Sequence, residues 1–170
     1  MVVRSILGVV AVLCWLSTFL AGLTINSQPY RDALTEGNLD LQNLAMTMFT
    51  YTVTNAALLC LLSGVIGAVA YTLIGVKKVE DSAEGESPSV SLADTPGGAV
   101  VAGVLRSFVI FLVFISGVYI GASDAFSATT QDQYARVVAT TCLLSFFVSF
   151  NPSYFALVVN WFAPPEEVGK

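Results

Sequence analysis

Histidine is absent from this chain of 170 residues, and charged residues make up only 11% of it. Without histidine, the commonest proton shuttle near neutral pH and a frequent haem or transition-metal ligand are missing. The seven lysines and arginines are scattered and the net charge is −5, whereas a nucleic-acid surface needs clustered basic residues. We therefore expect no nucleic-acid partner, no metal site and no cofactor.

Paired reactive groups are also missing. Cys14, Cys60 and Cys142 lie far apart, each inside an apolar run, and form no C-x-x-C pair. In such surroundings a thiol acts as a small apolar side chain. No histidine, lysine or carboxylate accompanies a serine or cysteine within an apolar run, and there is no glycine-rich phosphate loop. These absences argue against an enzyme.

Apolar residues dominate instead. They make up 55% of the chain, and the mean hydropathy is +0.77. A globule of this size cannot hide so much apolar surface, and a helix needs roughly 20 apolar residues to cross a bilayer. Four segments approach or meet that length: 5–25, 44–74, 100–122 and 135–150. The sequence therefore predicts an all-α membrane protein, with residues 1–170 forming one integral-membrane domain surrounded by lipid.

The first apolar segment, 5–25, follows Arg4 and so has the outline of a secretory signal. Its apolar stretch exceeds the 7–15 residues typical of such signals, and no A-x-A cleavage pattern follows it. We therefore interpret it as a retained membrane helix.

Basic residues set the predicted orientation, because lysine and arginine concentrate on the cytoplasmic side. With the N-terminus inside, Arg31 and Arg136 lie outside, and the inner side holds Arg4, Lys77, Lys78, Arg106 and Lys170. We predict four crossings, cytoplasmic termini and a flexible cytoplasmic loop at 76–98, which is rich in serine and acidic residues. Small four-span chains are frequent in bacteria, which favours a bacterial inner membrane.

Asn151-Pro152 interrupts the last apolar stretch. The 135–150 segment alone spans about 24 Å, somewhat less than a full crossing. Either a longer helix is kinked by Pro152, or the helix ends near 150 and a second one begins. Asparagine is a good N-cap and proline suits the first helical position, so we predict a short helix at 152–162. Tyr154 and Trp161 would place it at the headgroups, where Arg106 can also reach.

Hydroxyl and amide side chains recur along two of the predicted spans. The first stripe comprises Asn43, Thr47, Thr50 and Thr54, and a weaker one comprises Thr141, Ser145 and Ser149. Such a face can line a water-filled path, or it can hydrogen-bond between packed helices. The pattern alone leaves both interpretations open.

Small residues mark the predicted helix-packing faces, because they let helix backbones approach closely in lipid. They are Ser63, Gly64, Gly67 and Ala68 in the second span, and Gly117 and Gly121 in the third. This spacing suits contacts within the chain as well as contacts with another copy or another membrane subunit.

Two non-enzymatic functions follow from these patterns. The hydroxyl stripe, the small-residue faces and the acidic outer loops favour a protein that assembles into an oligomeric pore or channel. The alternative is an accessory or scaffolding subunit of a larger membrane complex, which would explain the lack of catalytic or transport residues and the aromatic C-terminal stretch.

Overall fold

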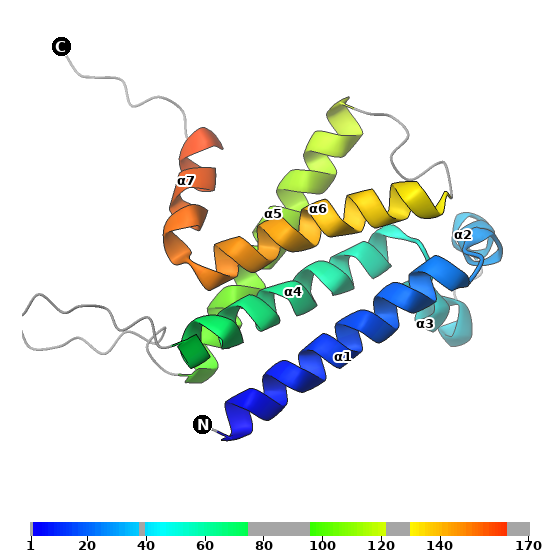
Figure 1. Cartoon of the computed structure of the whole chain (residues 1–170). Coiled ribbons are helices and arrows are strands. Elements are labelled where there is room, and N and C mark those ends of the chain that lie inside the picture. Colours follow the sequence, from blue (N-terminus) through cyan, green and yellow to red (C-terminus); the bar gives the residue numbers. More distant parts are fainter. Residues whose placement is uncertain (1, 38–39, 75–95, 122–129, 163–170) are drawn as a thin grey trace, which may run out of the picture.

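The computed structural model describes residues 2–37, 40–74, 96–121 and 130–162, and all regular structure within them is helical (Figure 1). The helices are α1 (Val2–Thr24), α2 (Gln28–Thr35), α3 (Leu41–Phe49), α4 (Val53–Ile74), α5 (Pro96–Gly121), α6 (Gln131–Phe150) and α7 (Pro152–Phe162). Four of them, α1, α4, α5 and α6, are long and apolar enough to cross a membrane. The chain is therefore all-helical in its described part, with the predicted number of spanning-length helices.

The predicted flexible loop at 76–98 falls mainly on residues 75–95, which lie outside the described part, and its last residues belong to the first turn of α5. α4 is central and packs against α1, α5 and α6. α1 runs antiparallel to α4, and α6 runs parallel to it (Figure 1). α5 diverges from α4 toward its C-terminal end. We call the bundle end that carries α2 and α3 the α2–α3 end, and the opposite one the α7 end.

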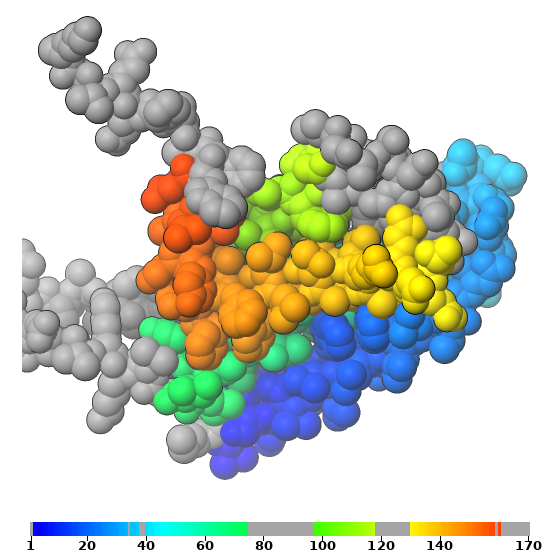
Figure 2. All heavy atoms as spheres, turned by 45° about the horizontal axis from the view of Figure 1, so that its top comes forward, coloured from blue at the N-terminus to red at the C-terminus, as the bar shows by residue number. Residues whose placement is uncertain are grey.

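The bundle buries many small and polar residues beside a few large ones such as Leu59 and Val138, and it exposes many large aliphatic side chains. In α1 the buried residues are Ala11, Thr18 and Gly22, whereas Val3 is 79% exposed and Leu13 is 57% exposed. The space-filling view shows α1 and α6 side by side in one broad surface (Figure 2). Water would penalise such a surface, while lipid matches it, so this inverted distribution is typical of helices packed within a bilayer.

The second apolar segment is not one helix, contrary to the single span predicted at 44–74. α3 ends at Phe49 and α4 begins at Val53. The intervening Thr50 has an extended backbone, with φ −110° and ψ 165°. Threonine competes with helix formation because its hydroxyl binds nearby backbone groups, and here the Thr52 hydroxyl both donates to the Thr47 carbonyl and accepts from the Asn55 amide. The span is therefore the shorter α4.

The last apolar stretch is divided at Asn151, as in the second of the two models considered above. α6 ends at Phe150 and α7 starts at Pro152, and Asn151 has φ −128° and ψ 106°. Its side-chain Oδ1 accepts a hydrogen bond from the Ser153 amide at 3.1 Å. Asn151 thus ends one helix and caps the next, and α7 turns away at the end of α6 (Figure 2).

Candidate functional site

The first hydroxyl stripe does not form a single helix face, because the break at Thr50 separates its members. Asn43 and Thr47 lie in α3, whereas Thr54 lies in α4. Thr47 and Thr50 are buried and donate to carbonyls of their own helix, Leu44 at 2.7 Å and Met46 at 2.9 Å. Thr54 is exposed and Asn43 is half-buried. The stripe predicted from helical spacing therefore gives no continuous polar path within the described bundle.

The second stripe lies at the contacts between α4, α5 and α6. Thr141, Ser145 and Ser149 are all buried. Ser145 Oγ lies 2.7 Å from Cys60 Sγ in α4, and Ser149 Oγ donates to the Gly103 carbonyl in α5 at 3.0 Å. Thr141 bonds back to the Val137 carbonyl. These side chains join helices or close on their own backbone, which corresponds to the packing interpretation.

Small residues of α4 lie where the sequence placed a packing face. A Cβ on Gly64 would collide with the Ser107 side chain and lie 2.9 Å from the Gly103 carbonyl, and one on Gly67 would lie 2.5 Å from the Phe146 carbonyl. The remaining members, Ser63 and Ala68, are also buried. The α4 face is thus in direct contact with α5 and α6.

Within the described bundle, α4 contacts a different pair of small residues in α5 from the one singled out in the sequence, and the predicted role of Gly117 and Gly121 stays a prediction. A Cβ on Gly117 would meet nothing within 4 Å, and the surroundings of Gly121 lie outside the described part. The small residues that α4 contacts are instead Gly103 and Ser107, spaced four apart like the predicted pair. α5 diverges from α4 toward its C-terminal end (Figure 1), so the small residues of α5 that pack against α4 are those near its start.

Arg106 lies level with the turn between α6 and α7. Its neighbours Gly103 and Ser107 both bond to Ser149, 3.0 Å and 3.1 Å away, and Ser149 precedes the Asn151 turn by two residues. Arg106 itself is half-buried, and Tyr154 in α7 is 49% exposed. The side chain of Trp161 lies outside the described part. Headgroup contact by these three residues stays a prediction.

A polar cluster at the α2–α3 end was not predicted from the sequence. Tyr134 in α6 donates its hydroxyl to Asn55 Oδ1 at 2.8 Å, and Asn55 Nδ2 donates to the Met48 carbonyl at 2.8 Å. Arg31 donates from Nε and Nη2 to the Tyr51 carbonyl at 3.0 and 2.8 Å. The cluster therefore satisfies carbonyls that the break between α3 and α4 leaves without helical partners.

Aromatic rings hold this cluster against α1. Tyr51 meets Tyr134 edge to face at 4.8 Å, and Tyr134 stacks on Phe19 at 5.5 Å, which in turn stacks on Trp15 at 5.1 Å. The Arg31 guanidinium lies over the Tyr51 ring, 5.1 Å from its centre. Burial raises the pKa of Tyr51, and the Arg31 cation opposes that rise. Tyr51 therefore stays a neutral phenol at physiological pH.

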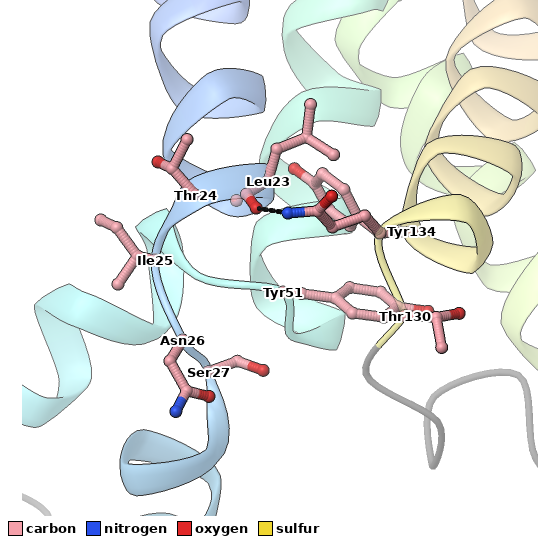
Figure 3. A pocket seen from close by; sticks show the side chains of 10 residues that line it. Leu23, Thr24, Ile25, Asn26, Ser27, Tyr51, Thr130 and Tyr134 are labelled. Atoms are coloured by element: carbon pink, nitrogen blue, oxygen red, sulfur yellow. Dashed lines mark hydrogen bonds between the residues drawn. The ribbon is translucent and has the colours of Figure 1, made fainter.

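A pocket of 240 Å³ opens beside this cluster, where α1 ends and α6 begins (Figure 3). Its lining includes the last turn of α1, the turn leading to α2, and the start of α6. Gly22 is required here, because any side chain would collide with the Tyr134 hydroxyl. Gln131 bridges the two helices by donating from Nε2 to the Leu23 carbonyl at 3.1 Å. The polar cluster and this pocket form the candidate functional site.

Metal-ligating side chains do not gather in the described part of the chain: no group of three or more histidine, cysteine, aspartate or glutamate residues lies together there. Cys14, Cys60 and Cys142 are free thiols. Comparison with protein families, with curated proteins and with solved structures finds no match. The structure thus defines a class, a bundle with four helices of membrane-spanning length, and function must be argued from its geometry.

Replacing Arg31 by lysine is expected to lower the free energy of unfolding by about 1 kcal/mol, because a single ammonium cannot direct two donors at the Tyr51 carbonyl in the geometry of a planar guanidinium. Detergent-denaturation curves in mixed micelles measure the change. The matched control is Arg136→Lys, since Arg136 is exposed and should tolerate lysine within about 0.5 kcal/mol, as surface sites usually do. Equal effects of the two changes would contradict the role given to Arg31.

Proposed function

We propose that this protein is a non-enzymatic, multi-pass integral membrane protein that acts as an accessory or scaffolding subunit of a larger membrane complex. The observation that carries the proposal is the closed polar interior. The buried hydroxyls of α3, α4 and α6 bond to helix carbonyls or to each other, while large aliphatic side chains face outward. A chain built in this way acts through its surface.

The inner membrane boundary is best placed at the level of Arg106 and the Asn151 turn. An arginine inside a span is costly unless its side chain reaches the headgroups, and the turn needs polar surroundings for its backbone. Both needs are met if this level is the headgroup region. α7 then runs along the interface, in agreement with the orientation expected from the basic residues.

α7 is the element at which we place contact with a partner subunit. It packs on α6 and projects from the end of the bundle (Figures 1 and 2). Tyr154 and Leu157 are 49% and 52% exposed and lie three residues apart, so they share one face. A partner with an apolar helix at the same depth would cover them.

The oligomeric pore remains a second candidate because of Thr54. Thr54 is exposed on the surface of α4. A hydroxyl side chain suits a surface that faces water or another copy better than one that faces lipid. The two neighbouring stripe residues, Thr47 and Thr50, are buried within the protomer and so would not line such a pore.

Capture from native membranes with determination of copy number separates these functions. We expect a second membrane protein at fixed stoichiometry, and no ion flux from the purified chain in liposomes. Tyr154→Ala with Leu157→Ala should reduce the captured partner at least fivefold. The paired control, Leu143→Ala with Leu144→Ala, alters equally exposed side chains of α6 and should leave capture unchanged. Ion flux that Thr54→Leu abolishes, with only self-association, would establish the pore instead.

A further inference from the structure

The pocket between α1 and α6 brings together two helix ends of opposite polarity. The C-terminal turn of α1 contributes Gly22, Leu23 and Thr24, whose carbonyls lie at the negative end of the helix dipole. The start of α6 contributes Thr130 and Gln131, at the positive end of that helix. Which charge the pocket favours depends on which of these two ends is already compensated.

The positive end is compensated and the negative end is not. Thr130 caps α6 by accepting a hydrogen bond from the Gln133 amide, and Asp132 places a carboxylate in its first turn. α1 has no basic residue in its last turn. The Leu23 carbonyl receives only a neutral amide, from Gln131. The pocket therefore retains the partial negative charge of the α1 carbonyls.

Ser27 adds a polar group without a partner. It is 4% exposed and lines the pocket, and its hydroxyl makes no hydrogen bond within the described part of the chain. Figure 3 shows the hydroxyl directed from the turn after α1 toward the side on which Tyr51 and Thr130 lie. Because the hydroxyl faces the pocket, a ligand or water there can complete its hydrogen bonding.

The walls of the pocket suit the apolar part of a small cation. The rings of Tyr51 and Tyr134 both line it, and aromatic faces attract cations. The Tyr134 hydroxyl is already bound to Asn55, which leaves its ring as the contact surface. Arg31 lies over the Tyr51 ring but does not line the pocket, and two of its donors are directed at the Tyr51 carbonyl.

We propose that this pocket binds a small primary alkylammonium ion. The ammonium group donates to carbonyls at the end of α1 and to Ser27 Oγ, and the short alkyl chain lies against the two tyrosine rings. The space of 240 Å³ accommodates a ligand of a few heavy atoms. For a ligand of about four heavy atoms, the ceiling of about −1.5 kcal/mol per atom limits the Kd to roughly 40 μM at best. The inference concerns this pocket alone and does not depend on the subunit function.

Saturation-transfer NMR with n-propylammonium chloride tests the proposal on the full chain in nanodiscs. We expect transfer to the propyl protons, with binding at least tenfold stronger than that of n-propanol, which has the same shape and no charge. Propionate should give no transfer. Ser27→Ala should weaken propylammonium binding about fivefold, since it removes one acceptor and leaves the carbonyls in place.

Two variants of Gln131 give a charge test at one position. Gln131→Lys supplies a tethered ammonium that can reach the Leu23 carbonyl, so it should abolish propylammonium binding. Gln131→Glu adds a carboxylate beside the pocket and should strengthen binding several-fold. Circular dichroism checks that both variants stay folded. Equal binding of propylammonium and n-propanol, equal effects of the two Gln131 variants, or no transfer to the folded parent protein would each overturn the proposal.

Discussion

Gly67→Val is expected to destabilise the bundle by about 3 kcal/mol, at the upper end of what overpacking usually costs. A Cβ at Gly67 would lie 2.5 Å from the Phe146 carbonyl oxygen, 3.1 Å from Ser149 Cβ and 3.2 Å from the Phe150 amide nitrogen. Two of these atoms belong to the α6 backbone and cannot rotate away. α4 and α6 would therefore have to separate along the face where both bury most of their polar side chains.

The control for Gly67→Val is Gly117→Val, because a Cβ at Gly117 meets nothing within 4 Å. This change should alter the free energy of unfolding by less than about 0.5 kcal/mol. Unfolding in mixed detergent micelles, followed by far-UV circular dichroism, measures both variants. A tolerated Gly67→Val would mean that α4 and α6 do not pack as closely as described. A strongly destabilising Gly117→Val would mean that another surface covers α5.

The long helices could be predicted from the sequence because the thickness of the bilayer sets a minimum length for an apolar helix. A crossing needs about 20 apolar residues, and the distribution of apolar residues along the sequence shows where such stretches lie. The Asn151 break was also within reach, since asparagine before proline combines an N-cap with a residue that suits the first helical turn. These signals are local, and each acts within a few residues of the position it determines.

The break between α3 and α4 was missed because several of the contacts that stabilise it come from distant parts of the chain. The stretch Thr50 to Thr54 carries no charge and adjoins apolar runs on both sides, and helical spacing places Thr50 and Thr54 on one face with Thr47. Three threonines among five residues were the available warning, since β-branched hydroxyl side chains favour non-helical backbone. Partners from distant segments, Arg31 and Tyr134, complete the break, and spacing along one helix cannot reveal them.

The candidate site was hidden for the same reason. Arg31 was considered only as a charge that orients the chain, and Tyr134 was not singled out, because neither has a local pattern. Both lie at the α2–α3 end, where Gly22 allows the Tyr134 hydroxyl to approach α1 and Arg31 binds the Tyr51 carbonyl. The conspicuous motif, Gly117 with Gly121, has no described contact at Gly117. In this chain the close helix–helix contacts form where the helices converge. They do not coincide with the most regular small-residue motif.

Asn55→Ala is expected to lower the free energy of unfolding by about 2–3 kcal/mol. Asn55 is fully buried, accepts from the Tyr134 hydroxyl at 2.8 Å and donates to the Met48 carbonyl at 2.8 Å. Alanine leaves both partners buried without a strong replacement, and the Tyr134 hydroxyl then has only the distant Phe19 carbonyl, at 3.5 Å. Thr54→Ala, one residue away and exposed, should change stability by less than about 0.5 kcal/mol.

A double-mutant cycle with Tyr134→Phe isolates the bond between the two side chains. Tyr134→Phe should cost about 1 kcal/mol, since it keeps the stacked ring and removes the hydroxyl. With Asn55 already replaced, the same change should cost almost nothing, because the hydroxyl no longer has its principal acceptor. The coupling should therefore be about 1 kcal/mol, within the range measured for hydrogen bonds between membrane helices. Additive effects would show that Asn55 supports the break through Met48 alone, and that α6 reaches this end of the bundle through its aromatic ring.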